Sequence, residues 1–309
     1  PNATLVIKDG DVLDVGTKVS VPTGTVVRDL HGLHIWPALI EPYCDLGLPA
    51  STTEERKAEN RAARNWNGAL RADAQAHALI KPDPKRAEEM RKQGFALAIT
   101  HRMDGIARGT SAAVLLDDRD PVESVVRSDV AAHFSFRRGS STDRYPGSLM
   151  GSVALVRQSF MDARWYAEQR QPKETDAVLA ALAVQLGRRL VMEAADRNDV
   201  LRWAKVLEEF RLRGIIKGAG DEYARLIAIK NTGLPLIVPF ALPEAYDVED
   251  PYDAQEVSFA RLKHWELAPY NAAYLDVAGI PFALTAHGRK DLSSMWKDLR
   301  KLVACGLDS

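Results

Sequence analysis

Hydrophobic and polar positions alternate through the first 36 residues, which is the pattern of short, half-buried strands. Turns rich in glycine, proline and aspartate separate these strands at residues 9–11, 16 and 22–24. The pattern predicts a small antiparallel sheet of four strands, at 3–8, 12–15, 18–21 and 25–30.

From residue 37 onwards, short apolar runs alternate with long amphipathic segments, as in a parallel sheet that is covered by helices. The runs that predict strands are 38–41, 95–100, 112–116, 130–135, 190–193, 214–217, 235–240 and 281–285. There are eight such runs, which is the number of strands in a closed (β/α)8 barrel of the TIM type. The sequence therefore predicts an α/β protein with a small N-terminal β-sheet subdomain at 1–36 and a (β/α)8 barrel at 37–309.

Capping residues mark several of the helices between these strands. Ser148 is expected to cap a helix that runs to residue 169, and Asn198 or Asp199 to cap the next one. Further helices are expected at 221–230, where acidic residues open the first turn, and at 295–305, before Gly306. The polar stretch at 48–84 predicts an excursion over the mouth of the barrel.

Composition excludes several classes of protein. The 309 residues include 41 Lys and Arg against 42 Asp and Glu, and a net charge of −1 gives no basic excess for nucleic acid or a membrane surface. No run approaches 18 apolar residues, so no transmembrane helix is expected. Two cysteines, Cys44 and Cys305, are too few for a disulfide framework and permit either redox compartment.

Residues 35–47, Ile-Trp-Pro-Ala-Leu-Ile-Glu-Pro-Tyr-Cys-Asp-Leu-Gly, resemble the first barrel strand of the amidohydrolase superfamily, which reads roughly Pro-Gly-(Phe/Leu)-Ile-Asp-x-His-x-His. Further segments are similar to bacterial amidohydrolases related to imidazolonepropionase, namely 80–86, 94–95, 102–110, 133–142, 145–152 and 217–223. The resemblance implies an amidohydrolase barrel whose members hydrolyse amide C–N bonds with a divalent metal. It is compatible with a periplasmic or secreted protein as well as a cytoplasmic one.

The resemblance also implies where metal ligands should stand, and other residue types occupy those positions. They are Tyr43, Asp45, Glu193, Lys217 and His287. An ammonium at Lys217 repels a divalent cation. We therefore expect no metal cofactor, and an ion pair between Glu193 and Lys217 that fills the space of the metal.

An alternative is a rebuilt metal site. Asp45, Glu193 and His287 are chemically capable ligands for Zn²⁺ or another divalent transition metal, and His101 or His133 would complete the set. The chain would then be a hydrolase of amide or cyclic amide C–N bonds with a small-molecule amide ligand. Cys44 beside Asp45 is a candidate nucleophile, although such a cysteine is more often a small buried apolar residue.

The resemblance further implies partners for this domain. Related chains continue beyond the helix that follows strand eight and return to the small N-terminal sheet, whereas this sequence ends at Ser309. An unpaired sheet edge requires cover. We therefore expect the rest of a longer polypeptide or a second copy in a homo-oligomer as the partner, with this domain as a non-catalytic structural or regulatory part of a larger hydrolase or assembly.

Overall fold

The computed structural model describes residues 3–49, 65–120, 122–169, 175–289 and 291–308. The chain divides into two compact units, Pro1–Ala38 and Leu39–Ser309. The excursion predicted at 48–84 falls partly outside the described residues. In the described part of the chain, no helix has the length and apolar character needed to cross a membrane.

The first unit contains two of its four predicted strands. Strands β1 (Thr4–Lys8) and β2 (Asp11–Gly16) pair in antiparallel register, with an irregularity between Val6 and Ile7. Residues 18–21 and 25–30 are not strands, so that part of the prediction is wrong. Alternation alone does not make a strand, because each strand also needs a neighbour for its backbone hydrogen bonds.

In the second unit, the described residues contain strands in all eight predicted ranges and two further strands. The strands are β3 (Leu39–Cys44), β4 (Phe95–Thr100), β5 (Ala107–Thr110), β6 (Ala112–Leu115), β7 (Val125–Arg127), β8 (Ala132–Ser135), β9 (Leu190–Glu193), β10 (Gly214–Lys217), β11 (Leu236–Pro239) and β12 (Phe282–Thr285). They form a six-stranded sheet in the order β12-β11-β10-β9-β8-β5 and a four-stranded sheet in the order β3-β4-β6-β7.

The strand pairing describes a mixed α/β fold but does not show the closed (β/α)8 barrel that was predicted. Strands β8 to β12 are parallel neighbours, whereas β6 runs antiparallel to β4, and β5 antiparallel to β8. The connection between the paired strands β4 and β6 is residues 101–111, which is shorter than the dozen or more residues that a parallel crossover needs. The strand predicted at 112–116 therefore exists with the opposite direction.

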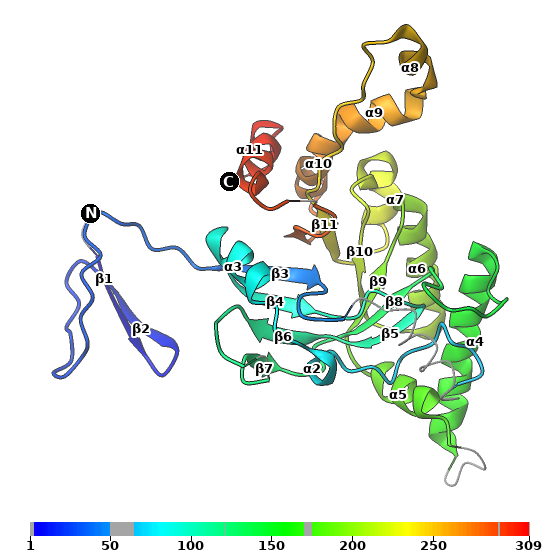
Figure 1. The fold of residues 1–309 in the computed structure, drawn as a ribbon, viewed down its shortest axis with the longest axis horizontal. Helices are drawn as coiled ribbons and strands as arrows, with labels where there is room; N and C mark the ends of the chain where they lie inside the picture. Colours follow the sequence, from blue (N-terminus) through cyan, green and yellow to red (C-terminus); the bar gives the residue numbers. More distant parts are fainter. Residues whose placement is uncertain (1–2, 50–64, 121, 170–174, 290, 309) are drawn as a thin grey trace. The chain divides into compact units, whose positions relative to one another are not determined.

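Helices alternate with the strands of the second unit, as the alternation of apolar runs and amphipathic segments predicts (Figure 1). They are α2 (Ala76–Leu79), α3 (Pro84–Lys92), α4 (Leu149–Glu168), α5 (Ala177–Gln185), α6 (Arg197–Phe210), α7 (Leu226–Lys230), α8 (Pro251–Glu256), α9 (Phe259–Leu267), α10 (Asn271–Val277) and α11 (Met295–Ala304), with 3-10 turns η1 (Glu222–Arg225) and η2 (Ala268–Tyr270).

Two of the predicted helix caps can be compared with the structure. Ser148 caps α4 as expected, because its hydroxyl accepts a hydrogen bond from Gly151 N. Helix α6 is capped by Asp196, whose carboxylate accepts bonds from the N–H groups of Asn198 and Asp199. The cap prediction for α6 was thus wrong by two or three residues, since Asp196, Asn198 and Asp199 are all residue types that cap helices.

A large apolar core lies between the β8–β12 strands and the helices that follow them. Helices α4, α5 and α6 supply Leu155, Leu182 and Trp203, which are completely buried in one cluster with strand residues such as Leu190 and Ile216. The indole of Trp203 stacks on Phe136 with ring centroids 3.8 Å apart, and its Nε1 donates to Glu193 O over 2.9 Å. Trp203 therefore ties α6 to the carboxyl end of β9.

Replacing Trp203 tests this packing. Trp203→Ala removes a fully buried indole and is expected to lower the free energy of unfolding by about 3–5 kcal/mol. Trp165 on α4 is 59% exposed, so Trp165→Ala is a matched control that should change stability by less than about 1 kcal/mol. Urea denaturation followed by circular dichroism measures both variants, and equal losses would contradict the assigned core.

Candidate functional site

The parallel strands β8 to β11 have two faces with different surroundings. Phe134, Met192 and Ile216 point into the core beneath the helices. Because side chains alternate along a strand, the intervening residues point the other way. Among these, Val191 and Ile237 form a separate small cluster with the buried ring of Tyr43. The face away from the helices is the interior into which the candidate residues project.

Strand register places two candidate residues side by side at the carboxyl ends. Ser135, Glu193 and Lys217 pair across β8, β9 and β10, each as the last residue of its strand. Ligand and catalytic groups of α/β folds commonly stand at such carboxyl ends. The sequence prediction that Glu193 and Lys217 share one end of the sheet agrees with this placement.

Tyr43 lies at the centre of the interior. Its ring centroid is 4.4 Å from that of His101, 5.1 Å from that of His287 and 5.8 Å from that of His133. The ammonium nitrogen of Lys217 lies 5.6 Å from the same ring centroid, within the range of a cation–π contact. A phenol ring and three imidazoles thus gather around one point.

Arg108 of β5 is the direct partner of Glu193. Its Nη1 lies 2.5 Å from Glu193 Oε2 and donates a hydrogen bond to the Tyr43 hydroxyl over 3.1 Å. Its Nε donates to Gly105 O over 3.1 Å. Both partners of this ion pair are buried, with side chains 4% and 13% exposed. The structure therefore pairs Glu193 with Arg108, and not with Lys217 as the sequence predicted.

The pKa values in this cluster follow from burial and charge. Burial acts to raise the pKa of Glu193, but Arg108 and, to a smaller extent, Lys217 outweigh it and hold that pKa below its ordinary value. Burial lowers the pKa of Lys217, and the nearby carboxylates offset this only in part. Glu193 is thus held ionised, while Lys217 binds its proton less tightly than an exposed lysine.

His101 and His133 form a stacked pair with ring centroids 3.6 Å apart and planes at 17°. Both residues are at most 1% exposed, and neither ring nitrogen of either residue has a hydrogen-bond partner in the described chain. Burial is the main cause that lowers the pKa of both, with Arg108 also contributing, and the pKa of His133 falls to about 3. The two rings are therefore neutral at pH 7.

The remaining predicted residues lie less centrally. Asp45 follows β3 and pairs with Arg86 over 2.9 Å at a half-exposed position. His287 follows β12 at an intermediate depth, and burial, with Lys217 as the next cause, lowers its pKa to about 4. Cys44 is buried, and burial raises the pKa of its thiol to about 12, which suits a small apolar residue better than a nucleophile.

The sequence prediction missed Arg108 and Glu41, two buried charged residues that bond to Tyr43. Glu41 of β3 accepts hydrogen bonds from Tyr43 N over 3.0 Å, from Ala286 N over 2.8 Å and from the Thr285 hydroxyl. These bonds join β3 to the end of β12. Both charged residues stand in short runs of otherwise apolar or small residues, and this signal would have marked them as buried.

The histidine and carboxylate groups are not arranged as a metal-ligand set. Within the described ranges, no three His, Cys, Asp or Glu side chains lie together in a way that would hold a metal ion. In particular, Asp45, Glu193 and His287 do not form such a group, since Asp45 is held by Arg86 and Glu193 by Arg108.

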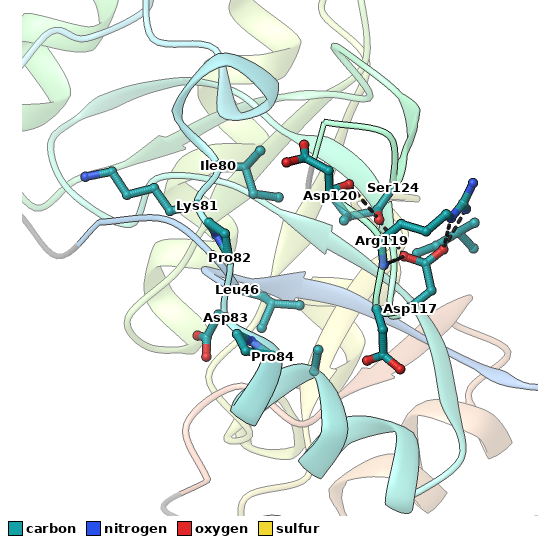
Figure 2. Close-up of a pocket in the computed structure, with 15 residues that line it drawn as sticks. Leu46, Ile80, Lys81, Pro82, Asp83, Pro84, Asp117, Arg119, Asp120 and Ser124 are labelled. Atoms are coloured by element: carbon teal, nitrogen blue, oxygen red, sulfur yellow. Dashed lines mark hydrogen bonds and ion pairs between the residues drawn. The ribbon is translucent and has the colours of Figure 1, made fainter.

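A pocket of about 400 Å³ lies elsewhere, beside the start of α3 (Figure 2). Residues 80–84 face the acidic turn at 117–120 across it. The carboxylate of Asp117 is already bonded to Ser124 and Arg119, and that of Asp83 accepts a bond from Arg86 N. None of the five candidate residues lines this pocket.

Comparisons with known proteins agree with the fold. No model of a protein family matches the chain, and no curated protein matches it. Among solved structures, the chain is similar to the crystal structure of an amidohydrolase from Thermotoga maritima MSB8, with a TM-score of 0.73 and 17% sequence identity. The match covers 99% of this chain and 79% of that one. At this identity the likeness shows an amidohydrolase-like fold.

The buried histidine pair predicts how stability depends on pH. Because the folded pKa of both rings lies below the unfolded value of about 6.5, the unfolded chain takes up protons first as the pH falls. The two rings do not lower the free energy of unfolding above about pH 6.5. As the pH falls towards 3, each ring lowers it by up to about 1.4 kcal/mol per pH unit.

Urea denaturation between pH 7 and pH 5 measures this slope. His133→Phe keeps a planar ring and should make the slope shallower than that of the parent protein. His31→Phe, at an exposed position of the first unit, should leave it unchanged. Identical slopes for the parent and His133→Phe would contradict the buried neutral pair.

The buried ion pair predicts a large coupling free energy. Arg108→Met or Glu193→Gln alone leaves the partner charge buried and should cost about 3–5 kcal/mol. The double variant should cost clearly less than the sum of both. The exposed pair Arg157–Glu209, at 2.6 Å, is the matched control and should couple by about 0–1 kcal/mol. Equal coupling in the two double-mutant cycles, measured by urea denaturation, would show that the interior pair is not formed.

Proposed function

We propose that this chain is an amidohydrolase-like domain that has lost the usual divalent-metal site and serves as a non-catalytic structural or regulatory part of a larger hydrolase or assembly. The observation that carries the proposal is the ion pair of Arg108 with Glu193 beside Tyr43 and Lys217. A divalent cation in this interior would stand next to a guanidinium and an ammonium.

The donor set supports the same proposal. Metal-assisted hydrolysis requires neutral imidazoles and carboxylates that are free to bind the ion, together with an open position for water. Here the carboxylates of Glu193 and Asp45 are bound by arginines, and the tyrosine that stands at a ligand position is buried, which raises its phenol pKa. The residues present do not fit the metal that the fold implies.

The motif resemblance extends the proposal to the subgroup of amidohydrolases related to imidazolonepropionase. The proposed partner is the rest of a longer polypeptide or a second copy of the chain. Exposed apolar residues in the first unit support a partner: Val26, Leu33 and Trp36 are 84%, 69% and 80% exposed. A two-stranded sheet is marginal by itself and gains stability from such cover.

One observation favours a second candidate function. The ring nitrogens of His101 and His133, and Nδ1 of His287, have no hydrogen-bond partner in the described residues and surround Tyr43. Unpartnered imidazole nitrogens are metal donors. The alternative is therefore a metal-dependent hydrolase of amide or cyclic amide C–N bonds, in which Arg108 would have to release Glu193 before a metal binds.

Metal analysis separates the two functions. The chain, purified without chelator, is dialysed against a trace of Zn²⁺ and then against metal-free buffer, and its metal content is measured by mass spectrometry. We expect a content far below one ion per chain. A stoichiometric transition metal that is lost in Glu193→Gln and retained in Glu209→Gln, where the carboxylate is on the exposed surface, would overturn the proposal in favour of the hydrolase.

A further inference from the structure

Lys217 is a buried residue, and no counter-ion in the described part of the chain contacts its ammonium. The residue is 7% exposed, and in the described part of the chain its ammonium makes no hydrogen bond and no ion pair. Its close electrostatic contact is the face of the Tyr43 ring, 5.6 Å away. A buried charge without a partner is costly, so a group that pairs with it would be bound favourably.

The two carboxylates that influence Lys217 already have other partners. Glu193 is 2.5 Å from Arg108. Glu222 Oε1 accepts hydrogen bonds from Ala219 N over 2.7 Å and Gly220 N over 3.1 Å, and its Oε2 accepts one from Asn271 Nδ2 over 2.6 Å. Both carboxylates act on Lys217 only through space.

A second cation acts on this ammonium through space. Arg137, two residues after β8, is exposed, and its charge is among the causes that lower the pKa of Lys217. The charges acting on Lys217 are therefore those of two carboxylates, Glu193 and Glu222, and two guanidiniums, Arg108 and Arg137. The two carboxylates act more strongly on Lys217 than the two guanidiniums do, but burial still lowers its pKa, so the positive charge of Lys217 is only partly compensated.

We propose that Lys217 binds the carboxylate group of a small organic acid, with Arg137 as a second contact at the rim. A carboxylate would place a negative charge beside an ammonium that has no counter-ion in contact, and its two oxygens can accept from an ammonium and a guanidinium together. A doubly charged phosphate would be repelled more strongly by the negative charge of Glu193 than a singly charged carboxylate would. This inference rests on the proposed loss of the metal, since a divalent cation at the end of β10 would repel the same ammonium.

Acetate is the probe, and acetamide is its neutral counterpart of nearly the same shape. Saturation-transfer NMR on the full chain, at pH 7 and constant ionic strength, measures both ligands. Acetate should bind saturably and acetamide should not. Lys217→Met should abolish acetate binding, and Arg137→Met should weaken it about tenfold, which corresponds to about 1.4 kcal/mol.

Two control variants keep these charges and remove others. Lys230→Met lies at the exposed end of α7, and Arg138→Met adjoins Arg137 but has its own partner, Asp143 O, at 2.9 Å. Both should bind acetate like the parent protein. If Lys217→Met does not fold, the inference is tested by comparing the acetate affinities of Arg137→Met and Arg138→Met. Weaker binding in Arg137→Met alone supports the inference, and equal binding overturns it.

Other results would overturn the inference. They are an absence of saturable acetate binding, equal binding of acetamide, unchanged binding in a folded Lys217→Met variant, or tighter binding of inorganic phosphate than of acetate. Metal content measured on the same sample distinguishes the two proposals. Stoichiometric metal overturns the proposed function together with this site, whereas a metal-free chain that ignores acetate overturns this site alone.

Discussion

Burial of the Arg108 guanidinium is the constraint on which the interior of the second unit depends. A guanidinium removed from water must have its donors satisfied, and here they reach Gly105 O, the Tyr43 hydroxyl and Glu193. These acceptors come from three separate segments of the chain: the turn before β5, strand β3 and strand β9. Strand β5, the Tyr43 hydroxyl and the carboxylate of Glu193 are therefore linked through one side chain.

The backbone around Arg108 is shaped by glycines that allow close approach. Gly105 and Gly109 have positive φ of 96° and 78°. A Cβ on Gly109 would lie 1.9 Å from Ala74 O, and one on Gly105 would lie 2.8 Å from Ala69 O. The segment around residues 69–75 therefore lies directly against β5, and isolated bridges join Leu70 to Ala107 and Gln75 to Thr110. This close approach holds β5 in place and so directs Arg108 inward.

In the second unit the sequence predicted strands where the structure has them, because apolar runs of strand length mark buried strands directly. The sequence did not predict that β6 runs antiparallel to β4. Apolar runs show where strands lie, but they do not show the direction in which neighbouring strands run. The sequence also did not predict that Asp45 turns to Arg86 while Tyr43 turns inward. Strand β3 ends at Cys44, and the alternation on which the prediction relied ends with it.

Glu193 pairs with Arg108 although Lys217 is its neighbour in register, and the chemistry of the two cations explains the difference. A guanidinium is planar and weakly hydrated, so it can lose its water and bond several acceptors at once. An ammonium is a compact, strongly hydrated charge, and its flexible stem favours a position where water or a ligand remains in reach. Arg108 therefore forms the buried ion pair with Glu193. Lys217 contacts the ring face of Tyr43, and no carboxylate of the described interior contacts its ammonium.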